Sequence, residues 1–351
     1  MSKKSITISN SDKLSFIGTF STMINAGIPI LETMDSLLED AKGNTKKILE
    51  SMRADIVQGE SLYAALSKFP LVFDKVTVNV VKASEEAGTL DVVLKDLKNQ
   101  IQKDIEFGDS VKSAITYPIV IFVMFLAVLI LILVVVVPKI ATVFLSLRVA
   151  LPLPTRILIF ASNIILHQTI PLIVALILIN GGIFFLYKTR KQLVLNIIFS
   201  LPFVSKLIKE IDLARFFRSM YLLLTSGITI TTALELARDV VLRTDISHAI
   251  AYGQETVSAG KKLSEAFKGK KNIFPGVIIK ILESGEKTGT LDKSMEEISN
   301  YMDYQVSSTL KTLIALLEPL MLVVVGVLVG GMMMAIIAPI YGLISQVGGG
   351  R

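Results

Sequence analysis

The sequence contains no cysteine and only two histidines, His167 and His248, among its 351 residues. The absence of cysteine excludes disulfide bonds, thiol catalysis, iron–sulfur clusters and zinc sites built on cysteine. Two isolated histidines do not make a histidine-rich metal site. Composition therefore points away from redox and metal-dependent enzymes, although the sequence leaves open whether acidic turns bind a divalent cation.

Charged residues are also scarce, at 19% of the chain, and the net charge of +6 is too small to indicate a nucleic-acid-binding protein. The chain has no G-x-x-x-x-G-K-[ST] phosphate-binding loop, no G-x-S-x-G nucleophile motif and no H-E-x-x-H metalloprotease motif. We therefore predict no catalytic residues, no cofactor and no enzymatic activity, and no direct nucleic-acid partner.

Hydrophobic residues, by contrast, make up 52% of the chain and gather in three long uncharged runs. A bilayer crossing needs roughly 20 apolar residues, which predicts transmembrane helices at 117–137, 170–187 and 319–344. The limits of the second are the least defined, because the apolar stretch around it is longer than one crossing needs.

The polar N-terminus and the distribution of Lys and Arg predict the topology. Residues 1–116 contain 14 Lys and Arg and residues 188–318 contain 18, which indicates that both segments are cytoplasmic. The predicted order is a polar tail (1–13), a first cytoplasmic domain (14–116), the first span, an outer loop with an interfacial segment (138–169), the second span, a second cytoplasmic domain (188–318), the third span and an outer tail (345–351).

The two cytoplasmic segments are copies of one another. Segment 27–30 (GIPI) matches 227–230 (GITI) two hundred residues later, and after a one-residue insertion 85–91 (EEAGTLD) matches 286–292 (EKTGTLD). The repeat continues into the spans, where Tyr117-Pro118 matches Glu318-Pro319 and Pro138 matches Pro339. Apolar residues within each copy recur at three- and four-residue steps. The chain is thus expected to be all-α, with two homologous cytoplasmic helical bundles and three transmembrane helices.

Most candidate functional or structural residues lie at positions that match between the two copies, and we call these positions repeat-matched. Glu85 and Glu286, each before a glycine turn, are expected to be exposed or salt-bridged, with cation binding and partner contact as alternatives. Glu318 is a helix N-terminal carboxylate or a packing or partner residue, and Gly326 and Gly330 allow close helix contact. The other candidates are Gly27, Pro29, Gly88, Leu90, Tyr117, Pro118, Gly227, Gly289, Leu291, Pro319 and Pro339.

These motifs together resemble the platform proteins of type II secretion and type IV pilus systems. The resemblance rests on the duplicated GIPI/GITI segments, the Gly-Thr-Leu turns, the V-x-x-A-I-x-Y-P run at 111–118 and the Glu318-Pro319 and Pro339-Ile-Tyr341 pairs of the last span. It extends from about Leu14 to Ser345. Ser110 departs from the pattern, because family members often carry a basic residue there.

The resemblance implies a multi-pass protein of a prokaryotic inner membrane with a cytoplasmic N-terminus. Its implied partners are a cytoplasmic hexameric ATPase, pilin-like subunits in the bilayer, other inner-membrane assembly proteins and further copies of itself. The first cytoplasmic segment has a net charge of −2 and the second of +4, so the copies are expected to bind different partners.

Two other functional classes remain as alternatives. A transporter or channel subunit would also have spans and an internal repeat, but the spans lack the ionisable groups that mark transport paths. A membrane enzyme built on Glu85 and Glu286 is the weakest hypothesis. The sequence leaves open whether the machine secretes proteins, builds pili or takes up DNA, how many copies assemble, and which copy binds the ATPase.

Overall fold

The computed structural model describes residues 6–146, 153–168 and 202–348, together with Pro171, Leu178, Gly181 and Gly182. Every secondary-structure element in these ranges is helical. The predicted second span at 170–187 lies outside the described residues, apart from those four positions. The chain divides into two compact units. The first comprises Met1–Ser110 and Ser205–Thr309, and the second comprises Val111–Val204 and Leu310–Arg351.

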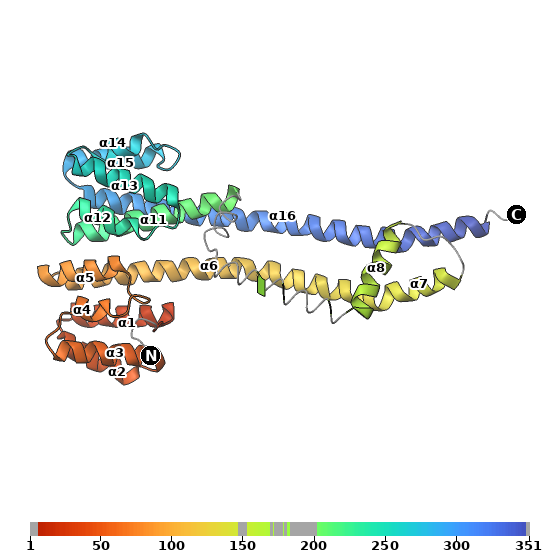
Figure 1. Ribbon diagram of the computed structural model, residues 1–351, viewed down its shortest axis with the longest axis horizontal. Helices are drawn as coiled ribbons and strands as arrows, with labels where there is room; N and C mark the ends of the chain where they lie inside the picture. The colour runs from red at the N-terminus through yellow and green to blue at the C-terminus, as the bar shows by residue number, and fades with distance from the viewer. Residues whose placement is uncertain are drawn as a thin grey trace. The chain divides into compact units, whose positions relative to one another are not determined.

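The first unit contains both copies of the repeat, and each copy has the same order of six helices (Figure 1). In the first copy these are α1 (Asn10–Asn25), α2 (Ile30–Asp40), α3 (Gly43–Val57), α4 (Leu62–Ser67), α5 (Lys75–Ala87) and the start of α6 (Leu90–Leu131). In the second they are α11 (Pro202–Thr225), α12 (Ile230–Arg238), α13 (Thr244–Ser258), α14 (Leu263–Lys268), α15 (Gly276–Thr288) and the start of α16 (Leu291–Gly348).

Glycine turns end equivalent helices in the two copies. Gly27 and Gly227 have φ values of 79° and 80°, which a residue without a Cβ adopts at little energetic cost. At the first turn, the backbone N–H of Ile28 donates to Met23 O (3.0 Å), and at the second that of Ile228 donates to Leu223 O (3.0 Å). These bonds satisfy carbonyls at the helix end in a Schellman arrangement. The repeat in the sequence is therefore a repeat of backbone geometry.

Aromatic side chains fill the core of both copies. Phe16 lies 5.8 Å from Phe20 and 5.9 Å from Phe73 between ring centroids, and in the second copy Phe267 stacks on Phe274 at 3.9 Å. At equivalent core positions, the two copies have side chains of different sizes. A Cβ at Gly253 would come within 2.9 Å of the Phe267 ring, whereas the equivalent positions 52 and 66 hold Met and Leu. Both copies reach close packing through compensating sizes.

Among the described glycines of the second copy, Gly285 of α15 has the least space, against the start of α16. A Cβ at Gly285 would lie 2.1 Å from Ser294 Oγ and 3.2 Å from the Thr290 carbonyl oxygen. The equivalent residue of the first copy, Ser84, is fully buried and donates its hydroxyl to Val81 O (2.9 Å). Position 84 therefore accommodates a side chain that position 285 excludes.

This difference predicts unequal losses of stability when alanine is placed at the two positions. Gly285→Ala is expected to destabilise the protein by about 1–3 kcal/mol, the usual range for overpacking. Ser84→Ala removes one satisfied hydrogen bond and is expected to cost about 1 kcal/mol or less. Thermal unfolding of the purified full-length protein, followed by circular dichroism at 222 nm, measures both. Equal melting temperatures for the two variants would contradict the close α15–α16 contact.

The second unit contains the parts of α6 and α16 that follow Ser110 and Thr309, a π-helical turn η2 (Ile132–Val136), α7 (Val137–Ser146) and α8 (Leu153–His167). The π-turn precedes Pro138, which has no N–H to donate. Val137 donates its N–H to Ile132 O, five residues earlier, and the buried Ser162 hydroxyl of α8 donates to Leu133 O (2.6 Å). Helix α8 therefore binds the chain where its hydrogen-bond pattern changes.

Two stretches, Leu90–Lys139 and Leu291–Gly331, are long and apolar enough to cross a membrane. Their most apolar windows are 6% and 0% buried, unlike the core helices of a soluble protein, and neither lies at the N-terminus. Apolar side chains that face outward over such a length suit lipid. The first stretch contains the predicted span at 117–137, and the second contains residues 319–331 of the predicted span at 319–344.

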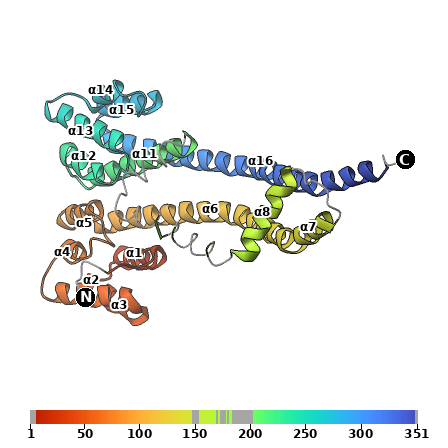
Figure 2. The ribbon, with the colours of Figure 1, turned by 45° about the vertical axis from the view of Figure 1, so that its right-hand side comes forward.

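Several element limits differ from those predicted. Helix α1 begins at Asn10, inside the predicted polar tail, because the Ser9 side chain caps it by accepting the Asp12 N–H (3.0 Å). Helices α6 and α16 run unbroken from the two copies of the repeat into the apolar windows (Figure 2). The described part of segment 138–169, predicted as an outer loop with an interfacial segment, is helical, because its apolar residues carry a helical pattern.

Candidate functional site

The repeat-matched acidic residues Glu85 and Glu286 cap short helices from a distance. Glu85 Oε1 accepts the Leu62 N–H at 2.9 Å, and Oε2 accepts the Tyr63 N–H at 3.1 Å. In the second copy Glu286 Oε1 accepts the Ser264 N–H at 3.1 Å, and Oε2 accepts the Ser264 hydroxyl. The N-cap residues of α4 and α14 make no side-chain cap of their own. A carboxylate 22–23 residues later in the chain supplies the cap instead, at the positive end of the helix dipole.

This geometry predicts that Glu85→Gln and Glu286→Gln each destabilise the protein by about 1–2 kcal/mol, the usual value of an N-terminal cap. Each kcal/mol lowers the melting temperature of a unit of this size by about 2–4 °C. The matched control is Glu86→Gln, because Glu86 is exposed and is the sequence neighbour of Glu85. A calorimetric scan of the full-length protein in which all three variants melt together would exclude the capping role.

The other repeat-matched candidates lie at helix ends. Gly88 and Gly289 close α5 and α15 in the left-handed conformation, with φ values of 72° and 73°. Leu90 and Leu291 are the first residues of α6 and α16, and Pro29 is the N-cap residue of α2. These residues shape the repeat, and no cluster of three or more His, Asp or Glu in the described part of the chain could hold a metal ion.

A groove of about 290 Å³ lies between α6 and α16 in the second unit, and we call it the Glu318 groove. Helix α6 lines it with Ser113, Tyr117, Pro118 and Ile121, and α16 lines it with Ile314, Leu317, Glu318, Met321, Leu322 and Val325. Glu318 is the one ionisable carboxylate among these ten residues. Because α16 begins at Leu291, Glu318 lies inside this helix and not at a helix N-terminus, and its interpretation as a helix N-terminal carboxylate is wrong. The groove thus brings together the repeat-matched positions Tyr117 and Glu318, which are far apart in the sequence.

Pro118 lines this groove, and Pro319 follows the lining residue Glu318 in α16. Pro118 and Pro319 occupy equivalent places inside α6 and α16. Because proline has no N–H, the carbonyls of Ala114 and Ala315, four residues earlier, lose their helical donors. Unpaired carbonyls in an apolar setting favour a hydrogen-bond donor. The groove itself combines an apolar wall with a carboxylate, an arrangement that suits an apolar helix carrying a polar or cationic group.

The two small residues of the last span have open surroundings. No described atom lies within 4 Å of a Cβ placed at Gly326 or Gly330. The face of α16 that carries them therefore has no partner helix in the described part of the chain. Pro339 lies within α16 and its side chain is outside the described set.

The sequence analysis missed a polar contact between the two copies inside the first unit. Lys103 of α6 donates to Asp303 Oδ2 (2.8 Å) and Asn300 Oδ1 (3.2 Å) of α16. Arg218 of α11, which is 8% exposed, pairs with Asp303 and lies 3.5 Å from Asp104 Oδ1. A surface ion pair also joins Lys75 of α5 to Asp239, the C-cap residue of α12, at 2.7 Å.

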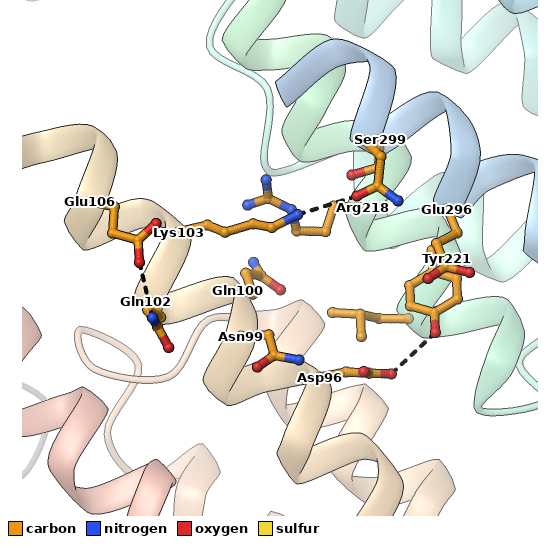
Figure 3. A pocket seen from close by; sticks show the side chains of 12 residues that line it. Asp96, Asn99, Gln100, Gln102, Lys103, Glu106, Arg218, Tyr221, Glu296 and Ser299 are labelled. Carbon is orange, nitrogen blue, oxygen red and sulfur yellow. Dashed lines mark hydrogen bonds between the residues drawn. The ribbon is translucent and has the colours of Figure 1, made fainter. Parts of the chain in front are cut away.

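A cleft of about 330 Å³, the inter-copy cleft, lies beside these ion pairs (Figure 3). Asp96 and Lys103 of α6 line one wall, and Arg218, Tyr221 and Glu296 line the other. Burial, followed by the charge of Asp96, raises the pKa of Tyr221 to about 12. The phenol therefore stays protonated at neutral pH and donates to Asp96 at 3.4 Å. Burial also raises the pKa of the Asp96 carboxyl.

One signal in the sequence could have revealed this contact. Arg218 stands among the buried residues Phe216, Phe217 and Met220 of α11, where the equivalent position of the first copy is Gly18. A charged residue on an otherwise apolar helix face, present in one copy alone, indicates a partner specific to that copy. Asp303 likewise stands where the first copy has Gln102.

Comparison with known proteins agrees with the duplicated architecture. The sequence model of the family "Type II secretion system (T2SS), protein F" matches residues 16–138 and again residues 216–339. These two matches coincide with the two copies of the repeat and the spans that follow them.

Named relatives extend over nearly the whole chain. The type IV pilus assembly protein PilC of Thermus thermophilus is 29% identical over 338 residues, covering 94% of this chain and 82% of the relative. PilC of Pseudomonas aeruginosa is 27% identical, with coverage of 95% and 90%, and type II secretion system protein F of the same species is 28% identical, with coverage of 93% and 81%. The chain therefore belongs to the type II secretion system protein F family, whose members are inner-membrane components of secretion and pilus machines.

Proposed function

We propose that this protein is the inner-membrane platform of a secretion or type IV pilus machine. The cytoplasmic unit contacts a hexameric ATPase, and the membrane-proximal groove holds the apolar helix of a pilin-like subunit during assembly. Other inner-membrane assembly proteins and further copies of the chain complete the machine. The N-terminus and both repeat copies are cytoplasmic in this proposal, as the distribution of Lys and Arg in residues 1–116 and 188–318 predicts.

The Glu318 groove is the observation that carries this proposal. Its walls are apolar, its volume of about 290 Å³ admits side chains of an incoming helix, and its carboxylate offers a charge-assisted hydrogen bond. Such a bond is stronger in a medium of low dielectric constant than in water. A groove of this kind favours a polypeptide helix over a solute.

Because α6 and α16 are continuous helices, they would transmit a movement of the cytoplasmic copies to the groove. Helix α6 begins in the first copy and lines one wall, and α16 begins in the second copy and lines the other. An α-helix is a stiff element, so a displacement of either copy changes the position of a groove wall. No phosphate-binding loop is present in the sequence, and the energy is therefore supplied by the ATPase.

A pair of adjacent positions on α16 tests the proposal. A photo-crosslinking amino acid replaces Leu322, which lines the groove, or Val323, which is 63% exposed and lies outside it. In the native host, position 322 is expected to crosslink to a pilin-like subunit several-fold more than position 323. Equal capture from both positions, or capture of a solute carrier from position 322, would contradict a pilin site in the groove.

A further inference from the structure

A cluster of five lysines surrounds α14 in the second copy. Lys261 and Lys262 precede the helix, Lys268 ends it, and Lys270 and Lys271 follow it. All five side chains are exposed. We call this set the lysine cluster. In residues 261–271, Glu265 is the one acidic residue, so this short segment has a strong local positive charge.

The charge of the cluster is largely unneutralised in the described structure. Lys268 lies 3.3 Å from Glu283 Oε1. No ion pair involves the other four lysines within the described residues. Exposed like charges held close together repel one another, so the isolated chain gains no stability from this arrangement.

The segment that carries the cluster is held in place by the fold. Lys270 donates its backbone N–H to Phe267 O (2.9 Å), and Phe274 donates its own to Lys270 O (2.9 Å). The ammonium of Lys209 on α11 donates to the Asn272 carbonyl. Phe267 and Phe274 are fully buried beneath it. The lysines therefore extend from a preorganised surface, and a partner that binds there orders little backbone.

The first copy lacks this feature at the equivalent place. Residues 60–70 contain one acidic residue, Glu60, and one basic residue, Lys68. These two pair with each other at 2.9 Å. The same helical framework thus carries a neutral surface in one copy and a strongly basic one in the other, while the turns and core that define the repeat are unchanged.

We propose that the lysine cluster is the docking surface for an acidic face of a cytoplasmic protein partner, the motor of the machine. This inference rests on the proposed function, because it takes the partner to be the ATPase. A patch of this charge raises the association rate with an acidic surface and makes binding sensitive to salt. The proposal also places the contact with the ATPase on the second copy of the repeat and not on the first.

The asymmetry between the copies favours a protein over anionic lipid. Both copies lead into an apolar helix at the same point of the repeat, and a lipid-binding role would apply to both alike. The lysine cluster occurs in the second copy alone. A charged surface that is present in one copy of a repeat and absent from the other is expected where each copy binds a different protein.

Binding of the ATPase from the same organism to the full-length protein in nanodiscs of zwitterionic lipid tests the proposal. The variant combines Lys262→Glu, Lys270→Glu and Lys271→Glu. The matched control combines Lys42→Glu, Lys46→Glu and Lys47→Glu, three exposed lysines of the first copy, and changes the net charge equally. The cluster variant is expected to bind at least tenfold more weakly, chiefly through slower association, and its affinity is expected to depend less on salt.

Every other outcome of this experiment contradicts the docking surface, and some outcomes also bear on the platform function. Equal weakening by both triple variants, or unchanged binding by the cluster variant, overturns the docking surface while leaving the platform function intact. Absence of binding by the unmodified protein contradicts both. A final arm adds vesicles containing about 30% phosphatidylglycerol: if the cluster controls vesicle binding and not ATPase binding, the surface recognises lipid and the proposal is wrong.

Discussion

Replacing Glu318 by leucine is expected to reduce pilus assembly or secretion more than tenfold, with the protein still present in the membrane. The carboxylate is the one ionisable acid lining the Glu318 groove, so leucine leaves a partner's polar group without its acceptor. Loss of a hydrogen bond to a charged group costs about 1.5–3 kcal/mol, and 1.4 kcal/mol corresponds to a factor of ten. Counting surface pili or secreted substrate measures the effect.

Two further variants separate the charge from the shape of the groove. Glu318→Gln keeps the side chain's size and one acceptor, and an intermediate loss is expected. Tyr117→Phe, at the repeat-matched position of α6, removes a hydroxyl alone and is expected to lower assembly less than threefold. Wild-type assembly by Glu318→Leu, at equal protein level on an immunoblot, would exclude the carboxylate from partner recognition.

Arg218→Met is expected to weaken the contact between the two copies by about 3 kcal/mol. The arginine is 8% exposed and pairs with Asp303. Removing one partner of a buried ion pair costs about 3–5 kcal/mol, because the other charge stays behind. Lys103 remains 2.8 Å from Asp303 and offsets part of that cost, which places the expected value at the lower end of the range.

The absence of cysteine gives a clean assay for this contact. Cysteines at positions 75 and 239 replace an exposed ion pair, which contributes about 0–1 kcal/mol, and a short bismaleimide joins them. Arg218→Met is expected to reduce the crosslinking yield several-fold. Lys206→Met serves as the control, because Lys206 lies on the same helix and its side chain is 64% exposed. Undiminished crosslinking in the Arg218 variant would show that the polar network does not hold the copies together.

Local features of the fold could be predicted from the sequence. The turns at Gly27 and Gly227 follow from glycine's access to positive φ, and the sequence repeat is sufficient to identify both positions. The long uncharged runs likewise predicted the two apolar helices that the structure describes. Helix limits were less predictable, because the α6 helix continues through the expected boundary at residue 116 without a cap or a break.

Contacts between distant residues could not be predicted in the same way. Glu85 caps a helix 22–23 residues earlier in the chain, whereas sequence reasoning considered it as an exposed, salt-bridged or cation-binding carboxylate. Arg218 and Asp303 are separated by 85 residues, and nothing in the repeat pairs them, since the first copy has glycine and glutamine at the equivalent positions. Tyr117 and Glu318 were matched by the repeat, but their common groove depends on where α6 and α16 lie in the fold.

The coupling of cytoplasmic work to the Glu318 groove is tested most directly by one crosslinking measurement. A photo-crosslinking residue at position 322 reports the pilin-like subunit in the native host, in cells with an active ATPase and in cells whose ATPase binds but does not hydrolyse ATP. The platform mechanism predicts that the crosslinking pattern changes several-fold with ATP hydrolysis and that Glu318→Leu abolishes the change. If the crosslinking pattern is the same with the active ATPase and with the ATPase that does not hydrolyse ATP, the transfer of work through α6 and α16 to the groove is contradicted.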